Sequence, residues 1–88
     1  MELWIRSQDK ERITKIDEVY YSSDDYGHYV MCYKDQFTGY KLGKYKSKER
    51  VLEVLDEIQK LDIGNNPNIE VSCYAYSLIK VTYNMPKE

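Results

Sequence analysis

Three cations crowd the start of a segment that has helical periodicity. Lys46, Lys48 and Arg50 surround Ser47, and Glu49 is the one acid among them. A helix N-terminus carries partial positive charge and free N–H groups, so it disfavours cations and favours a bound phosphate. The spacing predicts an anion site here. The alternative is that the lysines extend into solvent and that Glu49 offsets the dipole.

Aromatic side chains are the second candidates for chemistry, because 10 of the 88 residues are Tyr. Trp4 and Arg6 alternate with Leu3 and Ile5, so they point away from the expected core face. A base stacked on a ring contributes about 1–3 kcal/mol, and arginine adds phosphate or cation–π contacts. The alternative is that a subunit interface or a small second cluster covers this face. The stacking and the interface interpretations are compatible, because a ligand could lie at a dimer interface that both subunits line. The predicted ligand-binding residues are Trp4, Arg6, Tyr45, Lys46, Ser47, Lys48, Arg50, Tyr74 and Tyr76.

Catalysis and metal binding have little support. His28 is the single histidine, and Cys32 lies four residues along the same expected strand. That separation is about 13 Å, too far for a thiolate–imidazole pair. Asp24, Asp25 and His28 match no recurring metal-ligand spacing, and glycine-rich phosphate or nucleophile motifs are absent from the sequence. We expect no catalytic residue, no metal, no cofactor and a non-enzymatic protein.

Length and composition are typical of one soluble globular domain over residues 1–88, with 42% hydrophobic and 32% charged residues. Such a chain buries about 60–65% of its surface, so a ligand larger than a sugar or base would need a second subunit. Apolar runs are too short for a membrane span, and residues 1–7 lack a signal-peptide core. We expect a cytoplasmic protein in which Cys32 and Cys73 are buried thiols rather than a disulfide.

The charge is uneven along the chain. The net charge is −2, yet residues 34–50 hold six cations against two acids, a local charge of +4 that leaves −6 elsewhere. An acidic protein with a local basic strip favours a discrete small anion over a long polyanion, so nucleic acid is an unlikely partner. The alternative is a solvated basic face.

Periodicity predicts an α+β domain in the order β-β-β-β-α-β, with one helix on one face of an antiparallel sheet of four to six strands. Val51, Val54, Leu55 and Ile58 have helical spacing, and Ser47 has the position of an N-cap, so the helix covers about 47–61. The predicted strands are 2–7, 12–21 with a bulge or a shift of face, 28–34, 40–45, and 69–83 as one strand or as two broken near residue 75. Turns are expected at 22–27 and 35–39.

Three segments, WIRSQDKER, LGKYKSKERVLEVLDEIQ and NMPKE, resemble a group of small, mostly uncharacterised proteins from phages and prophages of Gram-positive bacteria. The resemblance covers the first twenty residues, residues 42–59 and the tail. It implies a small phage accessory protein in the host cytoplasm. By analogy, some compact phage proteins are counter-defence factors, including non-enzymatic sponges that sequester nucleotide signals of bacterial immunity.

These observations lead to a first hypothesis, a homo-oligomer that binds and sequesters a small phosphorylated, nucleotide-type signal. A second hypothesis is a protein-binding module, such as a phage inhibitor of a host or defence protein, in which acidic stretches face a basic partner. Those stretches are Asp17/Glu18, Asp24/Asp25 and Glu53/Asp56/Glu57. A third, sequence-specific DNA binding, is disfavoured because the single helix is acidic beyond Arg50.

Overall fold

The computed structural model describes residues 2–16, 18–33, 39–62, 64–75 and 78–88, and for residues 73–75, 78 and 79 it describes the backbone alone. It confirms the α+β class. Seven strands form two sheets, and one helix packs on them. In chain order the elements are β1 (Glu2–Arg6), β2 (Ile13–Lys15), β3 (Val19–Asp24), β4 (Gly27–Tyr33), β5 (Gly39–Tyr45), α1 (Lys48–Lys60), β6 (Ile69–Ala75) and β7 (Leu78–Asn84).

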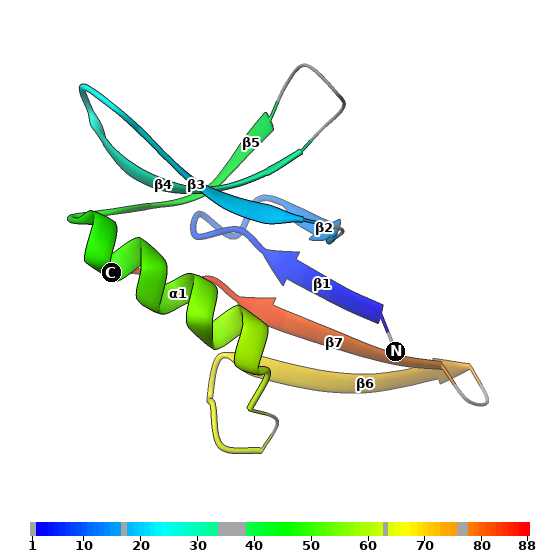
Figure 1. Cartoon of the computed structure of the whole chain (residues 1–88). Coiled ribbons are helices and arrows are strands. Elements are labelled where there is room, and N and C mark those ends of the chain that lie inside the picture. The colour runs from blue at the N-terminus through cyan, green and yellow to red at the C-terminus, as the bar shows by residue number, and fades with distance from the viewer. Residues whose placement is uncertain (1, 17, 34–38, 63, 76–77) are drawn as a thin grey trace.

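The larger of the two sheets combines strands from both ends of the chain. One sheet has the order β2-β1-β7-β6, and the other has the order β3-β4-β5. Neighbouring strands are antiparallel except β1 and β7, which run parallel with Ile5 opposite Tyr83. Figure 1 shows β1 and β7 side by side at the middle of the larger sheet. The N-terminal strand therefore completes a sheet whose other central strand comes from the end of the chain.

The helix begins and ends close to the predicted residues. Ser47 is its N-cap, with an extended backbone (φ −146°) and a side-chain oxygen that accepts a hydrogen bond from the Arg50 N–H at 3.1 Å. Leu61, at φ 44°, ends the helix in the left-handed conformation. Val51, Val54 and Ile58 are its buried residues. The stripe predicted from periodicity is the face that packs on the sheets.

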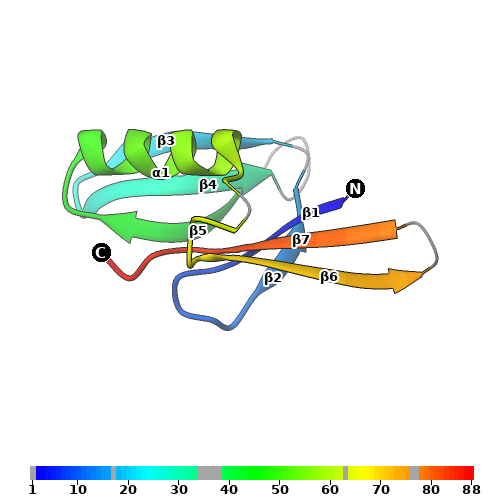
Figure 2. The same ribbon diagram turned by 90° about the horizontal axis from the view of Figure 1, so that it is seen from below.

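One hydrophobic cluster joins both sheets and the helix. Ile5 and Tyr83 enter it from the larger sheet, and Val30 and Leu42 enter it from the smaller one. In Figure 2, α1 lies over the three-stranded sheet, and β7 and β6 run along the opposite side. The Tyr83 hydroxyl donates to Glu57 Oε2 at 2.5 Å and so ties the larger sheet to the helix. Burial and the Glu57 carboxylate raise the pKa of Tyr83 far above its usual range.

The prediction of one strand over residues 12–21 is wrong. This segment forms β2 and β3, which belong to different sheets. The change of face that we interpreted as a bulge marks the passage of the chain from one sheet to the other. Ile16 is close to this passage, and its N–H donates to the Leu3 carbonyl at 3.0 Å.

Residues 69–83 form the two-strand alternative, a β6–β7 hairpin with an irregularity between Cys73 and Ala75. The loop predicted over 22–27 shortens to residues 25 and 26, because β3 continues to Asp24 and β4 begins at Gly27. The turn predicted over 35–39 lies outside the described residues up to Gly39, where β5 begins. Cys32 is a buried free thiol whose pKa is raised by burial, whereas the Cys73 side chain is outside the description.

Replacing the Tyr83 hydroxyl tests the tie between helix and sheet. Tyr83→Phe keeps the ring in the core but removes the donor to Glu57. We expect the free energy of unfolding to fall by about 1–2 kcal/mol, because the lost bond is made to a charged acceptor. Urea denaturation measures the change. Tyr33→Phe, at a Tyr that is 55% exposed, is the matched control and should lose less than about 0.5 kcal/mol. Equal losses in the two variants would contradict the assignment.

Candidate functional site

A hollow of about 350 Å³ lies where the β3–β4 turn, the end of β5 and the C-terminal tail meet. Its lining residues are Tyr26, Gly27, Lys44, Tyr45, Lys46, Lys87 and Glu88. Three of them are lysines and one is an acid, so the wall is mainly cationic. Tyr26, whose side chain is 81% exposed, stands at its rim. A cationic wall beside an accessible ring fits a small anion that carries an aromatic group.

A β-bulge aims the lysines of β5. Val30 pairs with Gly43 and Met31 pairs with Lys41, which leaves Leu42 as the extra residue. Leu42, in the bulge, and Tyr45, three residues later, both point into the core, with 1% and 4% of their surfaces exposed. Lys44 and Lys46 flank Tyr45 and are exposed. The extra residue therefore turns these two lysines to the outside.

Glycines make room for this arrangement. A Cβ on Gly43 would meet the Tyr45 hydroxyl at 2.8 Å, so the absent side chain lets the ring lie across the strand. A Cβ on Gly27 would meet the Lys44 side chain at 2.6 Å. The Lys44 stem therefore packs directly on the backbone of the β3–β4 turn. The two glycines set the depth of the hollow on its Tyr45 and Lys44 sides.

Tyr45 forms a neutral wall of the hollow. Its hydroxyl donates to the Pro86 carbonyl at 2.8 Å, which ties β5 to the tail. Burial raises the pKa of Tyr45 well above its usual range, so the phenol stays protonated at any physiological pH. A protonated phenol does not repel an anion.

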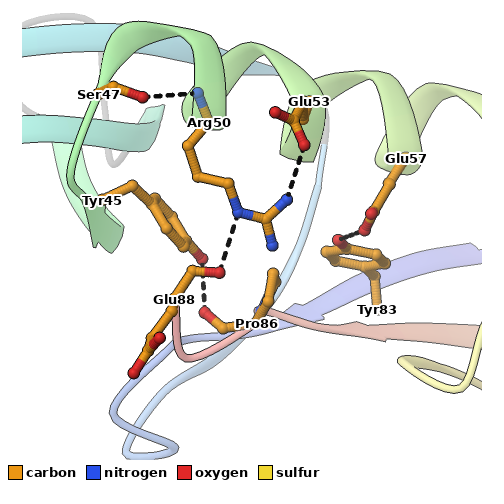
Figure 3. A network of polar contacts seen from close by, with 8 residues as sticks. All are labelled: Tyr45, Ser47, Arg50, Glu53, Glu57, Tyr83, Pro86 and Glu88. Atoms are coloured by element: carbon orange, nitrogen blue, oxygen red, sulfur yellow. Dashed lines mark hydrogen bonds and ion pairs between the residues drawn. The ribbon is translucent and has the colours of Figure 1, made fainter.

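Arg50 has a structural task that the sequence analysis did not foresee. Its Nε donates to the backbone oxygen of Glu88 at 2.9 Å, and its Nη1 lies 3.3 Å from Glu53 Oε2. The guanidinium also lies 5.9 Å from the centre of the Tyr45 ring. Figure 3 shows it between the helix and the tail. Arg50 thus holds the tail beside the hollow without lining it.

The other predicted ligand residues at the start of the helix, Ser47 and Lys48, do not line the hollow. The Ser47 hydroxyl is occupied by the N-cap bond. Lys48 Nζ lies 5.4 Å from the centre of the Tyr21 ring, whose hydroxyl is 2.9 Å from His28 Nδ1. Of the predicted helix-start residues, Tyr45 and Lys46 line the hollow, Arg50 supports it, and Ser47 and Lys48 have other contacts.

Trp4 and Arg6 lie elsewhere, on the larger sheet. Trp4 Nε1 donates to Glu2 Oε2 at 3.2 Å, and Lys80 Nζ lies 4.6 Å from the centre of its ring. Arg6 donates to the Lys10 carbonyl at 2.9 Å. Neither residue lines the hollow. The predicted side chains of Tyr74 and Tyr76 lie outside the described residues.

Gln8 organises the hollow, although no pattern in the sequence predicts this role. Its Oε1 accepts the Lys44 N–H at 2.8 Å, and its Nε2 lies 3.0 Å from the Lys44 carbonyl. The same nitrogen lies 3.2 Å from the Pro86 carbonyl and 2.5 Å from the Lys87 carbonyl. Lys44, Lys87 and Tyr26 also line the hollow without having been predicted as ligand residues. Local patterns do not reveal these residues, because the contacts join positions far apart in the chain.

Asp24 shapes the turn that carries Tyr26. Its Oδ1 accepts from the Tyr26 N–H at 2.8 Å, from the Gly27 N–H at 3.2 Å and from the Tyr29 hydroxyl at 2.9 Å. Lys41 Nζ lies 3.5 Å from its other oxygen. The hydrogen bond from Tyr26 is the main cause that lowers the pKa of Asp24 below 3.8. Asp24 therefore stabilises the β3–β4 turn.

Within the described residues, no group of three or more His, Cys, Asp or Glu side chains is arranged to hold a metal ion. In the same part of the chain, no helix is long and apolar enough to span a membrane. Comparison of the sequence with family models, with curated proteins and with solved structures finds no match.

Gln8→Ala should loosen the tail. The variant leaves the Lys44 N–H without its acceptor and the carbonyls that share the two Nε2 hydrogens without their donor, so we expect a loss of about 1–3 kcal/mol in the free energy of unfolding. Amide hydrogen exchange at Lys44 should also accelerate. Gln59→Ala, on the exposed side of the helix, is the control and should lose nothing, because alanine favours a helix. Unchanged exchange at Lys44 in Gln8→Ala would show that the amide is dispensable.

Acid should weaken the β3–β4 turn through Asp24. Because the folded-state pKa of Asp24 lies below 3.8, its carboxylate stabilises the fold at neutral pH, and this contribution is lost as the pH falls through the folded pKa. Asp24→Asn keeps an acceptor for the turn but removes the charge. We expect thermal melts from pH 7 to about pH 2.5 to show a smaller loss of Tm in Asp24→Asn than in the wild type. Parallel losses would exclude this role of Asp24.

Proposed function

We propose that the protein is a non-enzymatic binder of a small phosphorylated ligand with an aromatic base, held in the lysine-lined hollow. The observation that carries this proposal is the convergence of Lys44, Lys46 and Lys87 around a neutral phenol, Tyr45, beside the exposed Tyr26 ring. Lysines bind phosphate as mobile point charges, and a tyrosine face stacks on any base. The hollow thus supplies complementary groups for both parts of a nucleotide.

The size and charge of the hollow favour a small ligand. Its volume of about 350 Å³ is at the lower end of the range for small-molecule sites. Glu88 lines the same hollow, so phosphate is best accommodated toward Lys44 and Lys46, and a long polyanion is disfavoured by the net charge of −2. A mononucleotide unit fits these limits better than a nucleic acid strand.

The biological setting of the proposal rests on the resemblance to phage proteins. In that setting the protein acts in the host cytoplasm and sequesters a nucleotide signal of bacterial immunity, as a counter-defence sponge. A sponge needs affinity without turnover. The described lining residues support this, because the Tyr45 hydroxyl is committed to the Pro86 carbonyl and its raised pKa opposes its use as a base.

Thermal-shift measurements with AMP, ADP-ribose, a cyclic dinucleotide and inorganic pyrophosphate test the proposal. A bound ligand at about ten times its dissociation constant adds about 1.4 kcal/mol, which raises Tm by roughly 5–10 °C in a domain of this size. We expect base-bearing phosphates to exceed pyrophosphate. A flat response to all four probes at millimolar concentration would refute the proposal.

Lysine variants then locate the site. Lys46→Gln and Lys87→Gln should each weaken binding several-fold, and Gly27→Ala should do the same by displacing Lys44. Lys60→Gln removes the same charge from a side chain that is 75% exposed at the far end of the helix. It should bind as the wild type does. Isothermal titration with the probe that gives the largest shift measures all four variants, and equal losses in the three lysine variants would indicate a nonspecific charge effect.

A protein-binding function is the alternative, and one observation favours it. Leu52 is 42% exposed on the outer side of α1, close to the exposed acids Glu49, Glu53 and Asp56. An apolar residue among acids suits a basic protein partner. Capture of a partner by the wild type but not by Leu52→Asp, combined with no response to the nucleotide probes, would favour this function over ligand binding.

A further inference from the structure

Within the described residues, strand β6 is an unprotected edge of the larger sheet. It lies at the end of the order β2-β1-β7-β6 and pairs with β7 on one side. Its sequence, IEVSCYA, contains one charged residue, Glu70, and neither proline nor lysine. Edge strands of stable monomers are usually short, charged or interrupted by proline, because an open row of backbone groups attracts another strand. At seven residues, β6 has few of these safeguards.

The hydrogen bonds at the start of β6 show which backbone groups face outward. Asn84 N–H donates to the Asn68 carbonyl at 2.8 Å, so residue 68 faces β7. Ile69 N–H donates instead to the Asn66 carbonyl at 3.1 Å, on the side away from β7. Antiparallel pairing alternates these directions. The N–H and C=O groups of Val71 and Cys73 therefore point to the open edge.

The Val71 side chain is exposed where its neighbours are covered. It lies opposite Val81, which is fully buried, yet 46% of Val71 is exposed. Ile69, on the same face of β6, packs against the core cluster. Val71 thus extends the apolar face of the sheet beyond what the described part of this chain covers. An apolar side chain and an open pair of backbone groups coincide at one residue.

We propose that two copies of this chain associate through β6, antiparallel, with the two-fold axis at Val71. Each Val71 exchanges both backbone hydrogen bonds with Val71 of the other copy, and the two side chains cover one another. The same register sets Ile69 opposite Cys73 and Glu70 opposite Ser72. The irregularity after Cys73 limits the pairing to Ile69–Cys73. The two larger sheets then form one continuous sheet.

A second copy of the chain fits this edge because the edge is complementary to itself. In an isologous pairing every contact occurs twice, so a like-charge pair would be doubly unfavourable. Here the one charge, Glu70, faces a serine. Its Oε1 accepts from Asn84 Nδ2 at 3.1 Å, which leaves Oε2 for the Ser72 hydroxyl of the other copy. No lining residue of the lysine hollow belongs to β6, so this inference is independent of the proposed function.

Light scattering after gel filtration tests the association. We expect the wild type to have twice the chain mass of 10.5 kDa at high concentration and to dissociate on dilution, because a single strand pair is a small interface. Val71→Lys adds charge at the axis, and Val71→Pro removes the outward N–H without touching the bonds to β7. Each should raise the dissociation constant at least about tenfold.

Leu52→Lys is the matched control, because Leu52 is 42% exposed and lies on the helix; it should dimerise as the wild type does. Circular dichroism shows whether the variants remain folded. If Val71→Pro unfolds, Val71→Lys and the wild-type hydrogen exchange decide, since exchange at the Val71 amide should slow as protein concentration rises. A monomeric wild type at all concentrations, a dimer that persists in Val71→Lys, or exchange at Val71 independent of concentration overturns the proposal.

Discussion

A single side-chain amide holds together three segments that are distant in the chain. Gln8, just after β1, bonds both backbone groups of Lys44 at the end of β5 and lies against the carbonyls of Pro86 and Lys87 in the tail. A planar amide offers one acceptor and two donors in a fixed geometry, so it can mimic a backbone partner for two strands at once. The lysine-lined hollow lies between the segments that Gln8 joins. Its shape therefore depends on a contact made outside its lining as well as on the residues within it.

The helix could be predicted from sequence because its signals are local. Ser47 and the apolar stripe from Val51 to Ile58 lie within four turns of one another, and the structure places a helix over Lys48–Lys60. The division into two sheets could not be predicted. The parallel pairing of β1 with β7 joins residues nearly eighty positions apart, and the separation of β2 from β3 leaves only a change of face in the sequence.

The candidate site was predictable in part for the same reason. Tyr45 and Lys46 stand next to the helix N-cap, where charge near a dipole is visible in the sequence, and they line the hollow. Arg50 fits the same charge pattern, but its guanidinium donates to the Glu88 backbone oxygen and so holds the tail. Lys87 joins the site through long-range contacts of the tail with Gln8, Tyr45 and Arg50. Charge patterning thus points to the part of the chain where the hollow lies, and tertiary contacts decide which residues line it.

The bulge at Leu42 changes which side chains of β5 point toward the core. Strand side chains alternate, so if β5 ran through Leu42 without the bulge, the order of inside and outside would reverse from Gly43 onward. Tyr45 would leave the core, and both flanking lysines would enter it. Deletion of Leu42 itself would keep the facing of Gly43 and Tyr45, because it restores regular pairing with β4, whereas deletion of Lys44 would turn Tyr45 outward and Lys46 inward. The number of residues between the bulge and Tyr45, and not only the identity of the lysines, therefore decides which side chains line the hollow.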